Sequence, residues 1–282
     1  MMRKVLVWVL AVLVGLAGIG TAFGETAGNK AELMETIQGF AENGAKEFYF
    51  TCTKDVLNIW KARSFRDNFL PSIGIRGSKS TLTSEGGSHR IEMNRLIYMP
   101  GVKILGYYKS GQRKELSERE QWALEEAQNI AGQATGTDLE KEIFIHDELC
   151  RLVSYGDDKE ANNDDDCVIG ALVDGKANCD GYADAFYLIG RLAGLNVRYF
   201  LGAGITEEGK EEDHMWNLIK LGRNWVMVDV TWDDKEGEAS YKWFNRGAEG
   251  MKKDHEWDDD RVSEWVELCK QDFVELQPAS AQ

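Results

Sequence analysis

The chain has 282 residues, of which 43% are hydrophobic and only 3 are proline, and its formal charge at pH 7 is −15. This is enough apolar material for one large or two modest packed domains, and the composition argues against intrinsic disorder. The negative charge would repel nucleic acid and anionic lipid, so neither is an expected partner.

Residues 1–24 differ from the rest of the chain. Basic residues at positions 3–4 precede an uninterrupted apolar run, residues 5–23, and the small residues that end it fit a signal-peptidase site with cleavage before Glu25. The alternative is an uncleaved anchor, because the run is just long enough to span a bilayer. Both interpretations place the remainder outside the cytoplasm, either secreted or tethered to the membrane through residues 5–23.

Residues 25–112 predict a small α/β domain in which no residue points to catalysis. The hydrophobic periodicity and the turn residues predict its elements in order. They are a helix at 29–43 with Asn29 as its cap, a strand at 46–52, a helix at 55–69 that stops before Pro71, and glycine-punctuated strands that include 90–98 and 102–109. Pro100 and Gly101 are the expected turn between the last two strands.

Residues 113–276 predict a second, larger domain. Ser117 and Glu120 form a capping box at the start of its first helix. The further elements are a helix at 138–153, a helix at 178–192, a strand at 197–201 and a hairpin at 214–231.

Cys179 stands at or next to the first turn of the third of these helices. Free backbone N–H groups and the helix dipole favour a thiolate at that position, and the thiolate is the useful nucleophile. The alternative is a small core residue, which is what most free cysteines are.

The hairpin supplies a histidine and an aspartate. If Gly222 and Arg223 are its two turn residues, His214 and Asp229 become diagonal neighbours on one face. Asp229 also lies among apolar residues, where an ionised side chain needs a partner. A thiol, an imidazole and a carboxylate in this order form the nucleophile, base and orienting acid of thiol acyl transfer.

Three segments carry a family resemblance. They are Asn178-Cys179-Asp180-Gly181-Tyr182-Ala183, His214-Met215-Trp216-Asn217 and Val228-Asp229-Val230-Thr231-Trp232-Asp233-Asp234. Together they resemble the signature blocks of the bacterial transglutaminase-like superfamily. The resemblance covers about residues 138–260. It implies an α+β fold with a papain-like core, in which a helix-borne cysteine packs on an antiparallel sheet, and it implies Cys179, His214 and Asp229 as the catalytic residues.

The resemblance implies an enzyme acting on a protein or peptide substrate, with no cofactor and no metal. Peptidase-like amide hydrolysis is our first expectation, because nothing in the sequence indicates a site for an amine acceptor. A protein-glutamine transglutaminase is one alternative. A non-catalytic binding or scaffold domain at the cell surface is the other.

Other polar and aromatic residues near these segments have weaker functional interpretations. His146 falls on an apolar helical stripe, which is typical of a core histidine. Asp180 is typical of a residue at a helix N-terminus, and the alternative is that it tunes the reactivity of the Cys179 thiol. Trp216 and Trp232 pack or wall the site, and His255 resembles a recurrent feature of the family's tail without an assignable role.

The chain has 5 cysteines, and an odd number leaves at least one thiol without a partner within the chain. Cys150 and Cys167 flank one acidic loop, so we expect a disulfide there, with buried free thiols as the alternative.

Overall fold

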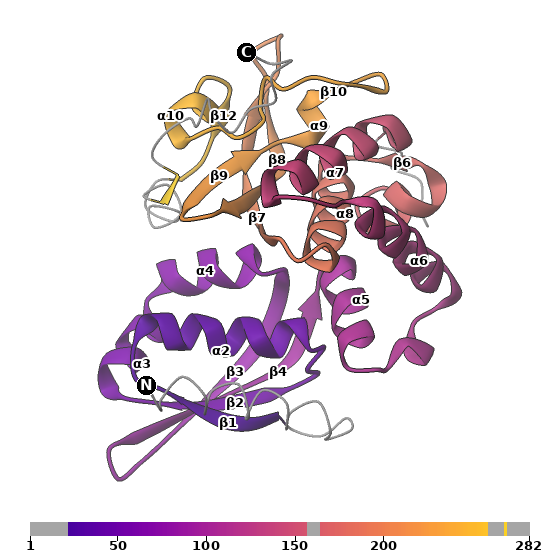
Figure 1. Ribbon diagram of the computed structural model, residues 1–282. Helices are drawn as coiled ribbons and strands as arrows, with labels where there is room; N and C mark the ends of the chain where they lie inside the picture. Colours follow the sequence, from indigo (N-terminus) through magenta and orange to yellow (C-terminus); the bar gives the residue numbers. More distant parts are fainter. Residues whose placement is uncertain (1–21, 157–163, 259–267, 270–282) are drawn as a thin grey trace.

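The computed structural model describes residues 22–156, 164–258 and 268–269. Its architecture is α+β, as expected. Within the described residues, one four-stranded sheet with its helices lies in the N-terminal half and a second lies in the C-terminal half (Figure 1).

The N-terminal sheet has the strand order β1-β2-β4-β3, with β1 parallel to β2 and the other neighbours antiparallel. Its strands and the helices of this half are β1 (Ala22–Ala27), α2 (Lys30–Glu42), β2 (Phe48–Cys52), α3 (Lys54–Lys61), α4 (Arg63–Ser72), β3 (Ile75–Glu85), β4 (Ser88–Tyr98) and α5 (Pro100–Lys109). The predicted cap of α2 is confirmed, since the Asn29 side chain accepts the N–H of Glu32 at 3.0 Å. In β2, Phe48, Phe50 and Cys52 share the buried face.

Two predictions for this half are wrong. The segment expected to be a strand at 102–109 is the helix α5, because Pro100 occupies its first turn, where a missing N–H costs nothing. A short apolar run fits either element, and here burial against a neighbouring helix selects the α form. The helix expected at 55–69 is two helices that break at Ala62, whose backbone is extended, and Pro71 lies inside the second one.

In the described part of the C-terminal half there are three long helices and a sheet of order β12-β7-β8-β9. Its elements are η1 (Arg113–Glu115), α6 (Glu118–Gln133), α7 (Asp138–Leu152), β5 (Ser154–Tyr155), η2 (Gly170–Asp174), β6 (Lys176–Ala177), α8 (Cys179–Leu192), β7 (Asn196–Ile205), β8 (Glu211–Leu221), β9 (Asn224–Val228), α9 (Val230–Asp233), β10 (Asp234–Lys235), β11 (Glu238–Ala239), α10 (Ala248–Met251) and β12 (His255–Glu256). The capping box of Ser117 and Glu120 is present. It satisfies two N–H groups that the start of α6 would otherwise leave free.

The β8–β9 hairpin has the predicted two-residue turn, since Leu221 pairs with Asn224. Pairing continues only to Asn217 and Val228. The strand expected to run to residue 231 is therefore too long. Asp229 leaves the sheet and becomes the N-cap of α9, where its side chain accepts the N–H of Trp232.

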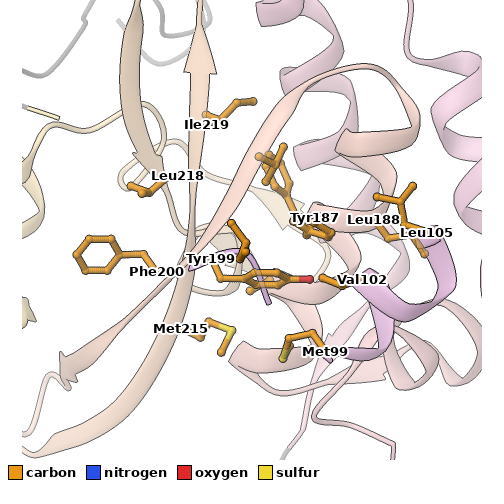
Figure 2. Close-up of a cluster of buried hydrophobic side chains, with 14 of the residues drawn as sticks. Met99, Val102, Leu105, Tyr187, Leu188, Tyr199, Phe200, Met215, Leu218 and Ile219 are labelled. Carbon is orange, nitrogen blue, oxygen red and sulfur yellow. The ribbon is translucent and has the colours of Figure 1, made fainter. Parts of the chain in front are cut away.

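Helix α5 connects the two halves by packing on α8. Met99, Val102 and Leu105 lie beside Tyr187 and Leu188 in one buried cluster (Figure 2).

A polar anchor lies at the same junction. The Asp184 carboxylate, buried on α8, accepts the N–H of Gly101 at 2.9 Å, the N–H of Val168 at 3.0 Å and the hydroxyl of Tyr199 at 2.7 Å. A Cβ on Gly101 would lie 2.5 Å from that carboxylate, so only glycine permits this approach. The N-terminal half is thus fixed directly to the helix that begins at Cys179.

No helix in the described ranges is both long and apolar enough to cross a membrane. The predicted signal or anchor, residues 1–24, lies outside those ranges except for its last three residues, which belong to β1. The domain limits 25–112 and 113–276 stay predictions.

Candidate active site

Cys179 is the first residue of α8. The Asn178 side chain caps the helix by accepting the N–H groups of Asp180 and Gly181 at 3.0 and 3.3 Å. The Asn178 N–H in turn donates to the carbonyl of Asp165, which anchors the entry to the helix. Cys179 is partly exposed, whereas every other cysteine is buried. Cys179 therefore lies at the start of a firmly capped helix and is partly exposed to solvent.

Gly181 allows the chain to pass close to this helix start. A Cβ at this position would lie 2.4 Å from the Asp165 carbonyl oxygen. Packing therefore requires a glycine two residues after Cys179.

His214 lies on β8 opposite Gly202 of β7, and it is almost fully buried. Its ring stacks on Trp232 with centroids 4.9 Å apart. Its Nε2 bonds the Oδ2 of Asp229 at 2.7 Å. Because Nε2 donates to a carboxylate, Nδ1 is the ring nitrogen left to interact with a thiol.

Asp229 is completely buried. Its Oδ1 accepts the N–H of Trp232 at 3.3 Å and its Oδ2 accepts from His214. The predicted contact between His214 and Asp229 is therefore present. It arises because the chain turns into α9, and not because the two residues face each other across paired strands.

The charges of this pair stabilise each other. Burial disfavours the charged imidazolium of His214, but the Asp229 carboxylate outweighs that effect and raises the pKa of His214 to about 10. A hydrogen bond and a charge interaction with Cys179 add to this rise. Burial alone would raise the pKa of Asp229, yet His214 and a second histidine hold it well below its usual value. At neutral pH the site thus holds an imidazolium beside the thiol.

Asp180 follows Cys179 and contacts its thiol. Its Oδ1 accepts from the Cys179 thiol at 3.8 Å, and its Oδ2 pairs with Arg76 at 2.7 Å. Burial raises the pKa of Asp180, while the Arg76 guanidinium opposes that rise. Asp180 lies in the first turn of α8, as expected, and it also contacts the thiol. Arg76 comes from β3, so the N-terminal half reaches the edge of the site, which the sequence did not indicate.

His255 is the second residue of the site whose position the sequence did not indicate. It is fully buried, and its Nε2 bonds Asp229 Oδ2 at 3.0 Å. The nitrogen and oxygen atoms of His214, Asp229 and His255 lie within 4.8 Å of one another. Each of these atoms is already engaged in a hydrogen bond, so we assign the group as a hydrogen-bonded network and not as a metal site.

Two further residues considered in the sequence, His146 and Trp216, lie in the core. His146 is a core histidine, as predicted: it is fully buried, lies 2.9 Å from Asp147 and 3.4 Å from Asp233, and stacks on Tyr241. Trp216 is buried against Phe200, with ring centroids 4.8 Å apart. Of the two predicted roles, packing in the core and forming a wall of the site, the structure therefore favours packing for Trp216.

The expected disulfide between Cys150 and Cys167 is wrong. Both are buried free thiols, and their sulfurs lie near the carbonyls of Val230 and Asp164. Burial raises the pKa of the Cys167 thiol to about 12 and raises that of Cys150 further. These thiols are therefore unreactive at neutral pH.

Residues 126–230 match a family described as the transglutaminase-like superfamily. The chain thus carries a transglutaminase-like domain within an α+β fold, and that domain contains Cys179, His214 and Asp229. Arg76 and His255 lie outside the matched residues.

Two named relatives match part of the chain. The kyphoscoliosis peptidase of Homo sapiens is 34% identical over 113 residues, which are 36% of this chain and 16% of the human protein. The kyphoscoliosis peptidase of Mus musculus is 34% identical over 111 residues, again 36% of this chain and 16% of that protein. The chain thus spans about a sixth of the length of these relatives.

Solved structures show weak overall similarity. One described as a TGase has a TM-score of 0.37 at 13% identity, covering 78% of this chain and 62% of its own. A candidate cysteine protease of Cytophaga hutchinsonii has a TM-score of 0.31 at 13% identity, covering 55% of this chain and 62% of its own.

Proposed function

We propose that the protein is an extracytoplasmic thiol-dependent enzyme that hydrolyses amide bonds in protein or peptide substrates. Cys179 is its nucleophile, His214 its acid and base, and Asp229 its orienting acid. One observation carries the proposal. A buried carboxylate lies 2.7 Å from an imidazole whose charged form also interacts with a partly exposed thiol at a helix start. A packed core gains nothing from leaving one thiol exposed beside a buried ion pair.

The reaction follows from this arrangement. The Cys179 thiolate attacks the amide carbonyl carbon, and the carbonyl oxygen takes up the negative charge of a tetrahedral intermediate. The backbone N–H of Cys179, at the first position of α8, is among the N–H groups that a helix leaves free, and it can donate to that oxygen.

Collapse of the intermediate breaks the C–N bond. His214 gives its proton to the leaving amine and becomes neutral, which leaves an acyl group on Cys179. A water molecule then attacks the acyl carbon and passes a proton to His214. The carboxylic acid leaves, and the thiolate and imidazolium are restored. Asp229 keeps the ring oriented throughout and stabilises its charged form.

Hydrolysis and cross-linking differ only in what attacks the acyl group. Water is present at about 55 M, so an amine competes only where the site holds it and excludes water. Trp232, the aromatic ring on His214, also packs edge-on against Trp243 at 5.9 Å, which indicates a structural use. The name of the relatives, a peptidase, also supports hydrolysis. Transglutaminase activity is the second candidate, supported by the family match.

A non-catalytic binding domain is the remaining alternative. It would place no demand on Cys179, His214 and Asp229, so their joint geometry argues against it. The extracytoplasmic location rests on residues 1–24 alone, and signal-peptide cleavage in cells would test it separately.

The activity is tested by incubating the protein with a glutamine-containing protein mixture and a labelled primary amine. We expect new N-termini without incorporation of the amine, and we expect Cys179→Ser to abolish them. Incorporation that depends on Cys179 would favour a transglutaminase. Neither product, with an intact fold, would favour the binding domain.

A further inference from the structure

Asp229 bonds a second imidazole besides that of His214. The Nε2 of His255 lies 3.0 Å from Asp229 Oδ2, and its Nδ1 lies 3.0 Å from Asp254 Oδ1. A ring nitrogen must carry a proton to bond a carboxylate, so His255 donates to Asp229. One oxygen of Asp229 therefore accepts from two imidazoles, while the other accepts a backbone N–H.

Strand pairing and ring contacts both fix the position of His255. Strand β12 pairs with β7, so that His255 lies opposite Gly204. The N–H of Ile205 also donates to the carbonyl of Asp254 at 2.7 Å. The ring of His255 lies 4.8 Å from that of Trp216 and 4.5 Å from that of Trp232, with no exposed surface. Strand β12 thus places the imidazole of His255 against the carboxylate of Asp229.

The backbone of Asp229 is held on both sides, since its N–H donates to the carbonyl of Trp243 at 3.2 Å and its carbonyl accepts the N–H of Asp233 at 3.1 Å. Asp229 caps a helix of only four residues, α9, and it has already left the sheet. The last torsion of an aspartate side chain is soft, so the plane of the carboxylate depends on the hydrogen-bond donors around it. A third donor fixes that plane and helps to compensate an ionised group that has no access to water.

We propose that His255 is a positioning residue, which holds Asp229 Oδ2 against His214 and so keeps the imidazole directed at Cys179. The proposal rests on the proposed function of Cys179, His214 and Asp229. His255 itself touches neither the nucleophile nor a substrate, and it acts only through the carboxylate.

The chain offers a matched control at the other end of α9. His146 is also fully buried, and it also lies between two carboxylates, Asp147 and Asp233. Replacing either histidine by phenylalanine makes the same change, since each variant loses a buried imidazole that lies between two carboxylates. Both variants should therefore lose similar stability, and only one should affect His214.

The test compares His255→Phe, His255→Gln and His146→Phe with the wild type. A glutamine can place an amide donor where Nε2 lies, so His255→Gln should restore the contact with Asp229. The first readout is the rate of Cys179 alkylation by iodoacetamide at pH 7. The second is the NMR titration of the His214 ring, which needs no substrate.

We expect His255→Phe to slow alkylation about 10- to 100-fold, which is the effect of one hydrogen bond to a charged group. We also expect it to shift the His214 titration to lower pH. His255→Gln and His146→Phe should stay within about threefold of the wild-type rate, clearly less than that slowing. If His255→Phe does not fold, His255→Asn replaces it, since its shorter amide reaches towards Asp254 and not Asp229.

Unchanged alkylation and titration in His255→Phe would overturn the proposal, and so would equal losses in His255→Gln or His146→Phe. Failure of the proposed function gives a different result: wild-type Cys179 would then react no faster than in His214→Gln, whatever residue stands at position 255.

Discussion

Replacing Asp229 by asparagine removes the charge that stabilises the imidazolium while keeping the shape of the side chain. Asp229 raises the pKa of His214 to about 10 from an ordinary 6.5, against the opposing effect of burial. This difference between the two pKa values of His214 corresponds to roughly 5 kcal/mol, at about 1.4 kcal/mol per pKa unit. Without that charge, burial lowers the pKa of His214 and the contact with Cys179 raises it, so we expect a pKa near the ordinary 6.5.

The consequence at pH 7.5 follows from the titration. In the wild type nearly all His214 rings are charged, and in Asp229→Asn about a tenth are. We therefore expect the rate of Cys179 alkylation at pH 7.5 to fall about tenfold. The chain has 4 histidines, so NMR can assign each ring signal by single substitutions and follow His214 directly.

Stability should change with pH in the same experiment. The folded pKa of His214 lies above its unfolded value, so its contribution to stability is complete below about pH 6.5 and is lost as the pH rises towards 10. The pKa of Asp229 is lowered, so its contribution is present above about pH 3.8 and is lost at lower pH. The free energy of unfolding of Asp229→Asn should therefore vary less than that of the wild type between pH 6.5 and 10.

The control is Asp233→Asn, which changes a buried carboxylate on the same short helix that contacts His146 and not His214. It should leave the His214 titration in place. A titration midpoint near pH 10 in Asp229→Asn would refute the reasoning, because the raised pKa would then have another source.

Three further predictions concern the junction, the core and the edge of the site. Gly101→Ala should lower the free energy of unfolding in urea by about 1–3 kcal/mol, because the new methyl meets the Asp184 carboxylate. Gly39→Ala, where a Cβ meets no atom within 4 Å, should instead raise it by about 0.5–1 kcal/mol, and a loss there would contradict the packing argument. Burial raises the pKa of Glu142 to about 8 from 4.5, so stability should fall as the pH rises through that interval. Glu142→Gln should flatten the fall by up to about 5 kcal/mol, and an unchanged slope would count against it. Arg76→Ala leaves an unpaired carboxylate beside the thiol, so it should slow alkylation of Cys179, and a faster reaction would exclude this role.

The parts of the site that the sequence predicted depend on local signals. The start of the helix at Cys179 follows from the Asn178 cap, and the hairpin follows from the Gly222-Arg223 turn. Each signal lies within a few residues of the feature it specifies. The contact between His214 and Asp229 was predicted from strand register, yet it forms through the turn into α9, since polar capping ended the strand earlier than its apolar residues indicated.

The parts that the sequence did not predict depend on contacts between distant segments. Arg76 lies 104 residues from its partner Asp180, and His255 lies 26 residues from its partner Asp229. Neither stands in a motif of its own. Helix α5 was mistaken for a strand because a short apolar run fits both periods, and only its burial against α8 decides between them. Such choices depend on packing, which a linear pattern does not contain.

The most direct measurement is alkylation of the native protein with iodoacetamide at pH 6, followed by peptide mapping. The account predicts that Cys179 is labelled first and that His214→Gln slows the labelling. The other cysteines are buried, and burial raises the pKa of each of their thiols. First labelling of any of them, or no labelling of Cys179 until the protein is denatured, would contradict the assignment of Cys179 as the nucleophile.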